Sequence, residues 1–226
     1  MRSSFFAAAL AAALAAASLC ASSANAASPV DIGVAAGTLG YGPQVGVVLV
    51  PGTFDARLNF GYLSDSYNTT SNGVYYDGHL KLQNLALLGD WHPFAGSFRL
   101  TGGLFYNDNK FDLTGTLTAG QTYTVNGASY TAHPGDHAVA RVDFNKLAPY
   151  LGFGWGDASD SAGLHFTSDI GVMYQGKPSA HIDVTTQPAY QSAANQYAQA
   201  AQSSLQSDLN SFRWYPVIQL GLVYRF

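Results

Sequence analysis

Apolar and polar residues alternate with a period of two along much of the chain. In the C-terminal segment the apolar side chains occupy every second position: Trp214, Pro216, Ile218, Leu220, Leu222, Tyr224 and Phe226. The same alternation occurs over residues 54–62, 98–106, 147–155 and 164–174. Successive side chains of a β-strand point to opposite faces, so each segment predicts a strand with one apolar face. Each has about the 9–11 residues that cross a bilayer as a tilted strand.

Three weaker segments complete a set of eight predicted strands. Residues 31–39 and 43–51 are rich in Gly and Val and predict a first hairpin that turns around residues 40–42. Residues 77–91 begin with a clear alternation, which slips near Asn84 into a continuous apolar run. A β-bulge in this strand would account for the slip.

The connections between these strands alternate in length. Short turns are expected at residues 51–53, 92–97 and 157–161, and long loops at residues 65–76, 107–146 and 176–212. Outer-membrane barrels have short periplasmic turns and longer extracellular loops. We therefore predict an all-β fold, an eight-stranded antiparallel up-and-down transmembrane β-barrel with long extracellular loops.

Two of the long loops contain patterns of their own. In residues 121–131 two β-prone runs flank Asn126-Gly127, which predicts a hairpin. In residues 189–212 apolar side chains recur every three or four positions after Pro188, which predicts a short amphipathic helix in the last loop. This helix is expected either to cover the barrel rim or to bind a partner, ligand or lipid.

Composition decides which face of the strands meets water. Only 11% of the 226 residues are charged, against about 25% in soluble domains. A soluble barrel of the lipocalin type would need a charged exterior, whereas a membrane barrel needs none. Aromatic residues also fall toward the strand ends, as in the girdles of membrane barrels. The net charge of −4 gives no basic surface for binding nucleic acid.

The first residues have the features of an export signal. Arg2 is followed by an alanine-rich apolar stretch and then by Ala24-Asn25-Ala26, a small-x-small cleavage pattern. We predict a cleaved signal peptide at residues 1–26 and a barrel domain at residues 27–226, located in the outer membrane.

The polar faces of the predicted strands would line a narrow interior. We expect a lumen network made of Asp55, Arg57, Lys81, Arg99, His165, Asp169, Gln219 and Arg225. Eight strands enclose just enough room for side chains, and buried charges are tolerated when paired. The network is therefore expected to plug the lumen; the alternative is a gated polar path for small ions or solutes.

Three constellations are weaker candidates for chemistry. His165, Thr167 and Asp169 share one strand face, but the face is inward and a serine nucleophile is missing from it. His133 and His137 flank a Pro-Gly turn, which favours a solvated loop over a metal site. Asp157 and Asp160 would cap a turn. We therefore expect no catalytic residue, metal or cofactor.

The chain also resembles a known group of proteins. Its ending, residues 220–226 with Leu222, Tyr224 and Phe226 on one face, is similar to the C-terminal assembly signal of Gram-negative outer-membrane barrels. The whole mature chain resembles the small barrels grouped with the OmpA transmembrane domain and OmpW. The phrases at residues 144–156, 169–172 and 212–216 carry this closer resemblance.

The pattern and the resemblance together suggest a non-enzymatic protein of structural or surface-interaction role. A narrow porin-like channel for small or hydrophobic solutes is the main alternative, and a lipid-A-modifying enzyme is the less favoured one. The expected partners are outer-membrane lipid and lipopolysaccharide, the barrel assembly machinery and periplasmic chaperones. Loops 107–146 and 176–212 could bind an extracellular ligand, and a monomer is expected.

Overall fold

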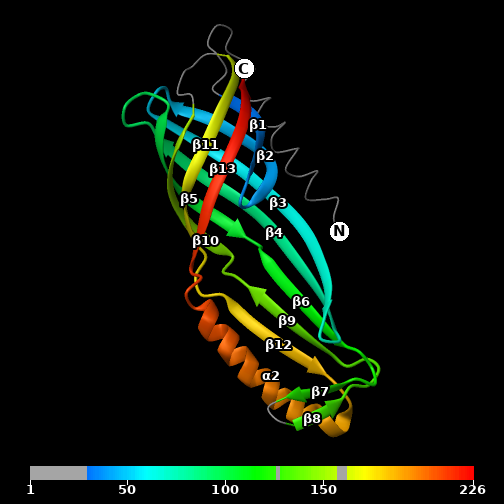
Figure 1. The fold of residues 1–226 in the computed structure, drawn as a ribbon. Helices are drawn as coiled ribbons and strands as arrows, with labels where there is room; N and C mark the ends of the chain where they lie inside the picture. Colours follow the sequence, from blue (N-terminus) through cyan, green and yellow to red (C-terminus); the bar gives the residue numbers. More distant parts are fainter. Residues whose placement is uncertain (1–29, 126–127, 157–161) are drawn as a thin grey trace.

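Eight antiparallel strands form a closed ring in the computed structural model, which describes residues 30–125, 128–156 and 162–226. The ring strands are β1 (Val30–Gly37), β2 (Gly40–Val50), β3 (Phe54–Ser71), β4 (Val74–Trp91), β5 (Phe98–Asn107), β10 (Leu147–Trp155), β11 (Gly163–Tyr174) and β13 (Trp214–Arg225). Neighbours in the sequence pair in order, β5 pairs with both β4 and β10, and β13 pairs with β1 to close the ring (Figure 1). The eight predicted strands are therefore confirmed. The predicted signal peptide and Asp157 and Asp160 lie outside the described residues.

Two details of the ring differ from the expectation. The first hairpin turns at Thr38 and Leu39, so β2 begins at Gly40, within the residues expected to form the turn. In addition, β4 contains no bulge near Asn84, because one register joins it to β3 from Trp91 to Val74. The apolar run arises because Ala86 and Leu88 are inward-facing apolar residues.

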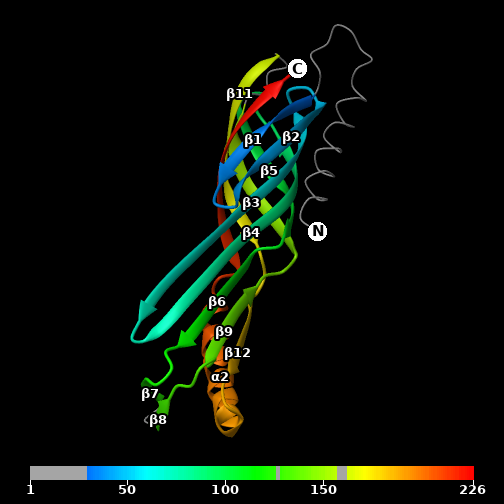
Figure 2. The same ribbon diagram turned by 90° about the vertical axis from the view of Figure 1, so that its right-hand side faces the viewer.

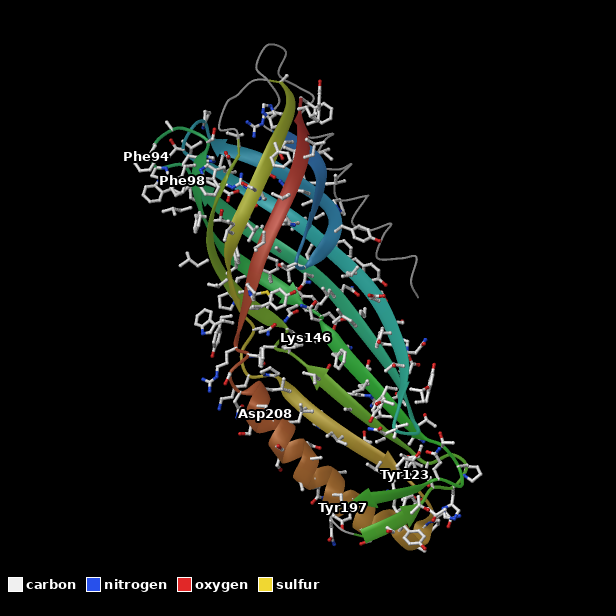
Figure 3. All side chains as sticks on the ribbon, viewed as in Figure 1. Phe94, Phe98, Tyr123, Lys146, Tyr197 and Asp208 are labelled. Atoms are coloured by element: carbon white, nitrogen blue, oxygen red, sulfur yellow. The ribbon has the colours of Figure 1, made fainter. Side chains whose placement is uncertain are left out.

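The outward face of the ring is apolar. Leu151 and Leu164 are 70% and 66% exposed, and Leu58, Leu87, Leu104, Ile170 and Ile218 elsewhere on the ring strands are exposed as well. Aromatic side chains mark both ends of this surface. At the turn end, defined by residues 51–53 and 92–97, these are Phe54, Trp91, Phe98, Trp155, Tyr224 and Phe226, and at the opposite loop end they are Tyr41, Tyr106, Tyr174 and Trp214. Phe94 and Phe98 lie together beyond the turn end (Figure 3).

The inward face changes character along the ring axis. Polar and charged side chains fill the half near the turn end. The half near the loop end holds an apolar cluster of Leu39, Ala86, Leu88, Phe105, Ala148, Tyr150, Met173 and Val217. The rings of Phe105 and Tyr150 meet edge to face, with centroids 5.5 Å apart. The interior is therefore filled by side chains at both levels.

The long connections are not simple loops. β3 and β4 extend together to a turn at Asn72 and Gly73, both with positive φ, as in an Asn-Gly hairpin. Beyond β5, the distal half of β4 pairs instead with β6 (Lys110–Leu117), followed by β9 (His137–Asp143) and β12 (Ser179–Thr185). The ring sheet thus continues as a projecting sheet (Figures 1 and 2). The connections at 65–76 and 107–146 are long, as expected, but much of each is strand, because their backbone groups pair in the ladders of β3, β4, β6 and β9.

The projecting sheet reverses the polarity of the ring. On the face continuous with the ring interior, the ladder aligns Leu80, Phe111, Val142 and Ala180, and in the next row Gly78, Leu113, Ala140 and Ile182. On the face continuous with the ring exterior it aligns Lys81, Lys110, Asp143 and Ser179, and then His79, Asp112, Arg141 and His181. The outward face is therefore apolar around the ring and charged beyond it.

A helix seals the free edge of the projecting sheet. Helix α2 (Pro188–Leu209), close to the predicted span, lies along β12 (Figure 1). Gln206 accepts a hydrogen bond from the Ala180 amide at 3.0 Å and donates one to the Pro178 carbonyl at 2.8 Å. Gln202 accepts from the Ile182 amide, and Gln191 bonds both Thr186 and Val184. These glutamines satisfy backbone groups that an edge strand would otherwise leave open to another chain. Among the described residues, no helix is both long and apolar enough to cross a membrane.

The glutamine contacts predict a local effect. Replacing Gln206 by alanine removes two hydrogen bonds, each worth about 1 kcal/mol, so the Ala180 amide should exchange with solvent about five- to tenfold faster. Hydrogen exchange measured on folded protein tests this. Gln199→Ala is the matched control, because Gln199 lies on an exposed part of the same helix. Equal exchange at Ala180 in Gln206→Ala and in the unmodified protein would contradict the edge-sealing role.

The hairpin expected within the connection at residues 107–146 lies next to the start of the helix, where Tyr130 meets Tyr190. The strands β7 (Thr122–Val125) and β8 (Ala128–Thr131) pair as a separate two-stranded sheet, which confirms the predicted strand pair on either side of Asn126-Gly127. The turn residues themselves lie outside the described residues.

Candidate functional site

Four charged side chains meet inside the ring. Arg57 of β3 pairs with Asp90 of β4 and donates to both oxygens of Asp169 on β11 at 2.9 Å. Arg99 of β5 donates to Asp169 at 2.9 Å and lies 3.5 Å from Asp90. Thr101 donates a further bond of 2.6 Å to Asp90. Two arginines and two aspartates thus form a closed ionic cluster across the lumen.

The cluster is electrically balanced and almost fully buried. The four side chains are at most 5% exposed, and their formal charges sum to zero. Removing ions from water costs several kcal/mol each, which only good geometry and complete pairing offset. The Arg57 guanidinium supplies that geometry, because it donates two parallel hydrogen bonds to each of Asp90 and Asp169. The arrangement occupies the centre of the lumen with groups that hold one another in place.

A second polar layer lies between this cluster and the turn end. His92 Nε2 is 3.0 Å from Asp55 Oδ2, and Arg225 Nη2 is 3.2 Å from Asp31 Oδ2. Asp31, Asp55 and Arg225, together with Arg57, Arg99 and Asp90 of the cluster and with His165, line a cavity of about 20 Å³. Such a space holds about one water molecule. Deeper toward the loop end, Asn59 donates to Gln219 at 3.2 Å.

Small residues make room for the larger inward side chains. A Cβ at Gly152 or Gly171 would collide with the Tyr150 hydroxyl, and one at Gly156 would collide with the Arg99 guanidinium. A Cβ at Gly154 would come within 2.9 Å of the Asp169 carboxylate. The glycine series at residues 152–156 therefore lets the cluster and the aromatic layer fit within the ring.

The structure brings together most, not all, of the predicted lumen residues. Arg57, Arg99 and Asp169 meet in the cluster; Asp55, His165 and Arg225 line the adjoining cavity; Gln219 bonds Asn59. Lys81, in contrast, does not belong to the lumen network, and that prediction was wrong. It has the outward parity of Leu85 and Leu87, and it lies where β4 pairs with β6 beyond the ring. The continuous register of β4 places its even-numbered residues inward, so β4 contributes Asp90, an anion that pairs with Arg57, to the lumen network instead of Lys81.

The remaining predicted positions are easily placed. Leu222, Tyr224 and Phe226 point outward from β13, and the last two rings meet at 5.1 Å. Asp169, the acid of the His165 constellation, has both oxygens engaged by arginines. Residues missed by the sequence reasoning are Asp31, Asp90 and His92. Asp90 and His92 follow the inward Leu88 by two and four residues, so the two-residue period could have placed both on the inward face.

The His133–His137 segment has a structural role. Asp136 accepts hydrogen bonds from the His133 amide at 2.7 Å and from the Tyr130 hydroxyl. The Tyr130 ring in turn meets Tyr190 of α2, with centroids 5.3 Å apart. Asp136 thus joins the β7–β8 hairpin to the start of α2. No group of three or more His, Cys or Asp side chains in the described ranges is arranged to hold a metal.

This junction should weaken in acid. Burial opposes ionisation of Asp136, but the His133 amide and the Tyr130 hydroxyl outweigh it and hold the pKa of Asp136 below its ordinary value of 3.8. A lowered pKa means that the stabilisation is present above the unfolded pKa and is lost as the pH falls through the folded one. Protection of the His133 amide, corrected for intrinsic exchange and compared with Asp136→Ala, should be full at about pH 6 and should be lost only at a pH below the ordinary carboxyl pKa of 3.8. Equal protection of this amide in Asp136→Ala and in the unmodified protein at about pH 6 would exclude the carboxylate as its source.

Comparison with known proteins identifies solved structures that have a similar fold. No protein-family model matches the chain, and no curated protein matches its sequence. Two crystal structures do superpose: Acinetobacter baumannii CarO2, with a TM-score of 0.57 at 19% identity, and Acinetobacter baumannii CarO, with 0.55 at 23%. Each alignment covers 88% of this chain and 98% of the other. The fold is shared.

A third structure, a major outer membrane protein from Thermus thermophilus, reaches a TM-score of 0.39 at 15% identity over 87% of this chain and 99% of that one. A likeness of that size does not indicate a common fold. The membership of the OmpA and OmpW group that the sequence suggested stays a prediction.

Proposed function

We propose that the protein is an integral outer-membrane β-barrel with a side-chain-plugged lumen, no enzymatic activity and a structural or surface-interaction role. The observation that carries this proposal is the combination of an apolar outer face with a closed, charge-paired interior. A water-exposed protein rarely leaves a continuous apolar band of this kind uncovered. From Phe98 to Tyr106 the band spans nine residues of β5, about the length that crosses a bilayer.

The direction and location follow from the same reasoning. The predicted signal peptide would direct export of the chain. The barrel assembly machinery would then recognise the outward side chains of Leu222, Tyr224 and Phe226. The turn end would then face the periplasm, and the projecting sheet with α2 would lie outside the cell. Lipopolysaccharide would surround the ring, and the outer surface of the projection would be available to a ligand.

The interior argues against a channel. The ionic cluster and the Phe105–Tyr150 pair lie inside the ring at two successive levels, and each would obstruct the lumen. This obstruction favours a plugged barrel over a narrow channel for small or hydrophobic solutes. Because the Asp169 carboxylate is committed to arginines, it is not available as the acid partner of His165.

Four measurements test this proposal. Unboiled purified protein should migrate differently from boiled protein on a detergent gel, and it should fractionate with outer membranes; a soluble periplasmic protein would overturn the assignment. In planar bilayers the barrel should be electrically silent. Reproducible conductance steps would instead support a channel. An acyl chain lost from lipid A in overexpressing cells would revive the enzymatic alternative.

A further inference from the structure

The outward face of β4 changes from apolar to charged within a few residues. Trp91, Leu87 and Leu85 are exposed and apolar, whereas Gln83 and then Lys81 follow on the same face. A strand rises about 3.3 Å per residue, so Lys81 lies about 13 Å beyond Leu85 along β4, or about 9 Å along the membrane normal at a 45° tilt. The headgroup region of a bilayer is roughly 5–8 Å thick on each side. Leu85 lies level with the outward Tyr106, so Lys81 is at the outer edge of the headgroup region if the ring spans a membrane.

Three lysines converge at this level. Lys81 stands directly opposite Lys110 in the β4–β6 ladder, so both side chains share the outward face. Their Nζ atoms lie 3.2 and 3.7 Å from the carboxylate of Asp108, which follows the outward Tyr106 by two residues. Lys146 pairs with the same carboxylate, at the point where the ring gives way to β6 and β9 (Figure 3). The lysine side chains are 39–49% exposed.

The cluster holds more positive charge than its acids neutralise. Like charges directly opposite each other destabilise a ladder, so the Lys81–Lys110 pair is costly in itself. One carboxylate with two oxygens serves three ammonium groups, each with three N–H donors. Hydrogen bonds from Lys146 and Lys81 outweigh partial burial and hold the pKa of Asp108 below its ordinary range, so this acid stays ionised. Asp143, opposite Lys110, is the second acid of the row. Three ammonium groups against two carboxylates leave a local excess of positive charge.

We propose that Lys81, Lys110 and Lys146 form a binding site for phosphate groups on the headgroups of outer-leaflet lipids. The site rests on the proposed membrane orientation. Its lysines lie just past the apolar band, where lipid phosphates would meet them while the acyl chains contact the leucines below. An ammonium group is a compact donor well suited to phosphate oxygens. The chain carries four lysines in total, and three of them meet at this one point.

The test uses native mass spectrometry of the folded, detergent-solubilised protein. Bisphosphorylated lipid A is titrated in parallel with dephosphorylated lipid A and with inorganic phosphate. We expect the phosphorylated lipid to bind more tightly than either probe. The substitutions K81Q, K110Q and K146Q should each weaken its binding about fivefold. The triple arginine variant should retain binding because it keeps the charge.

The control is K177Q, which removes the fourth, exposed lysine and the same amount of charge. Equal weakening by K177Q would show non-specific attraction and overturn the site. Equal binding of both lipid A forms, or tighter binding of free phosphate than of the lipid, would also overturn it. A gel shift on boiling and bilayer insertion are scored on every variant. Variants that still insert but bind lipid normally refute the site alone, whereas a chain that never inserts refutes the proposed function.

Discussion

Replacing Arg57 by alanine should lower the free energy of unfolding by about 3–5 kcal/mol. The substitution leaves Asp90 and Asp169 buried with Arg99 as the remaining cation of the cluster, and an uncompensated buried charge is costly. Denaturant unfolding in lipid vesicles, followed by the fluorescence of the three tryptophans, gives the measurement.

Arg141→Ala is the matched control for this experiment. Arg141 lies 3.5 Å from Asp112 on the exposed face of the projecting sheet, so its removal should cost less than about 1 kcal/mol. An Arg57 variant as stable as the Arg141 variant would mean that the buried cluster does not hold the ring together. Because the Phe105–Tyr150 pair lies at a separate level and would still obstruct the lumen, the Arg57 variant should also remain electrically silent.

Replacing Leu220 by arginine should cost about 2–4 kcal/mol in a membrane. Leu220 lies in the middle of the outward face of β13, with Trp214 and Phe226 at either end, so the new charge would sit near the centre of the bilayer. The expected result is a smaller folded fraction on insertion into vesicles, read from the gel shift between unboiled and boiled samples, and a lower free energy of unfolding.

An arginine placed beyond the aromatic residues of the loop end should leave the free energy of unfolding nearly unchanged. Asn68 shares the outward parity of Leu58 on β3 but lies in the projecting hairpin, opposite Asp77, so Asn68→Arg should change stability by less than about 1 kcal/mol. If Leu220→Arg were tolerated as well as Asn68→Arg, the apolar band would not be buried in lipid. The pair of variants therefore tests where the membrane lies on the molecule.

The ring was predictable because its alternation is strict. Each inward residue of β5, β10, β11 and β13 follows from parity alone, which is why Arg99 and Asp169 were expected to share the lumen. On β4 the alternation of apolar and polar residues did not identify the inward face, because Ala86 and Leu88 are apolar and point inward. An apolar layer inside the ring erased the contrast between the two faces, so the inward Asp90 was missed and Lys81 was placed on the wrong side.

The projecting sheet was harder to predict for a different reason. In β9 and β12 the alternating apolar residues are small or few, such as Ala138, Ala140 and Ala180, and their signal is weak beside the strong bands of the ring. The Asn72-Gly73 turn was a clear hairpin signal, but the strands around it are polar on both faces. Which of two neighbours a strand pairs with, as β4 does with β5 and then β6, depends on three-dimensional closure that no local pattern encodes.

The unbroken ladder between β3 and β4 has a mechanical consequence. The two strands keep one register over all eighteen residue pairs, from Phe54–Trp91 in the ring to Ser71–Val74 at the tip. They therefore form one uninterrupted two-stranded ladder, and the pairing of this hairpin has no break where it leaves the ring. A partner that pulls or pushes on the tip would transmit its load along these two strands into the ring wall, and anything held at the tip would keep a fixed orientation to the ring.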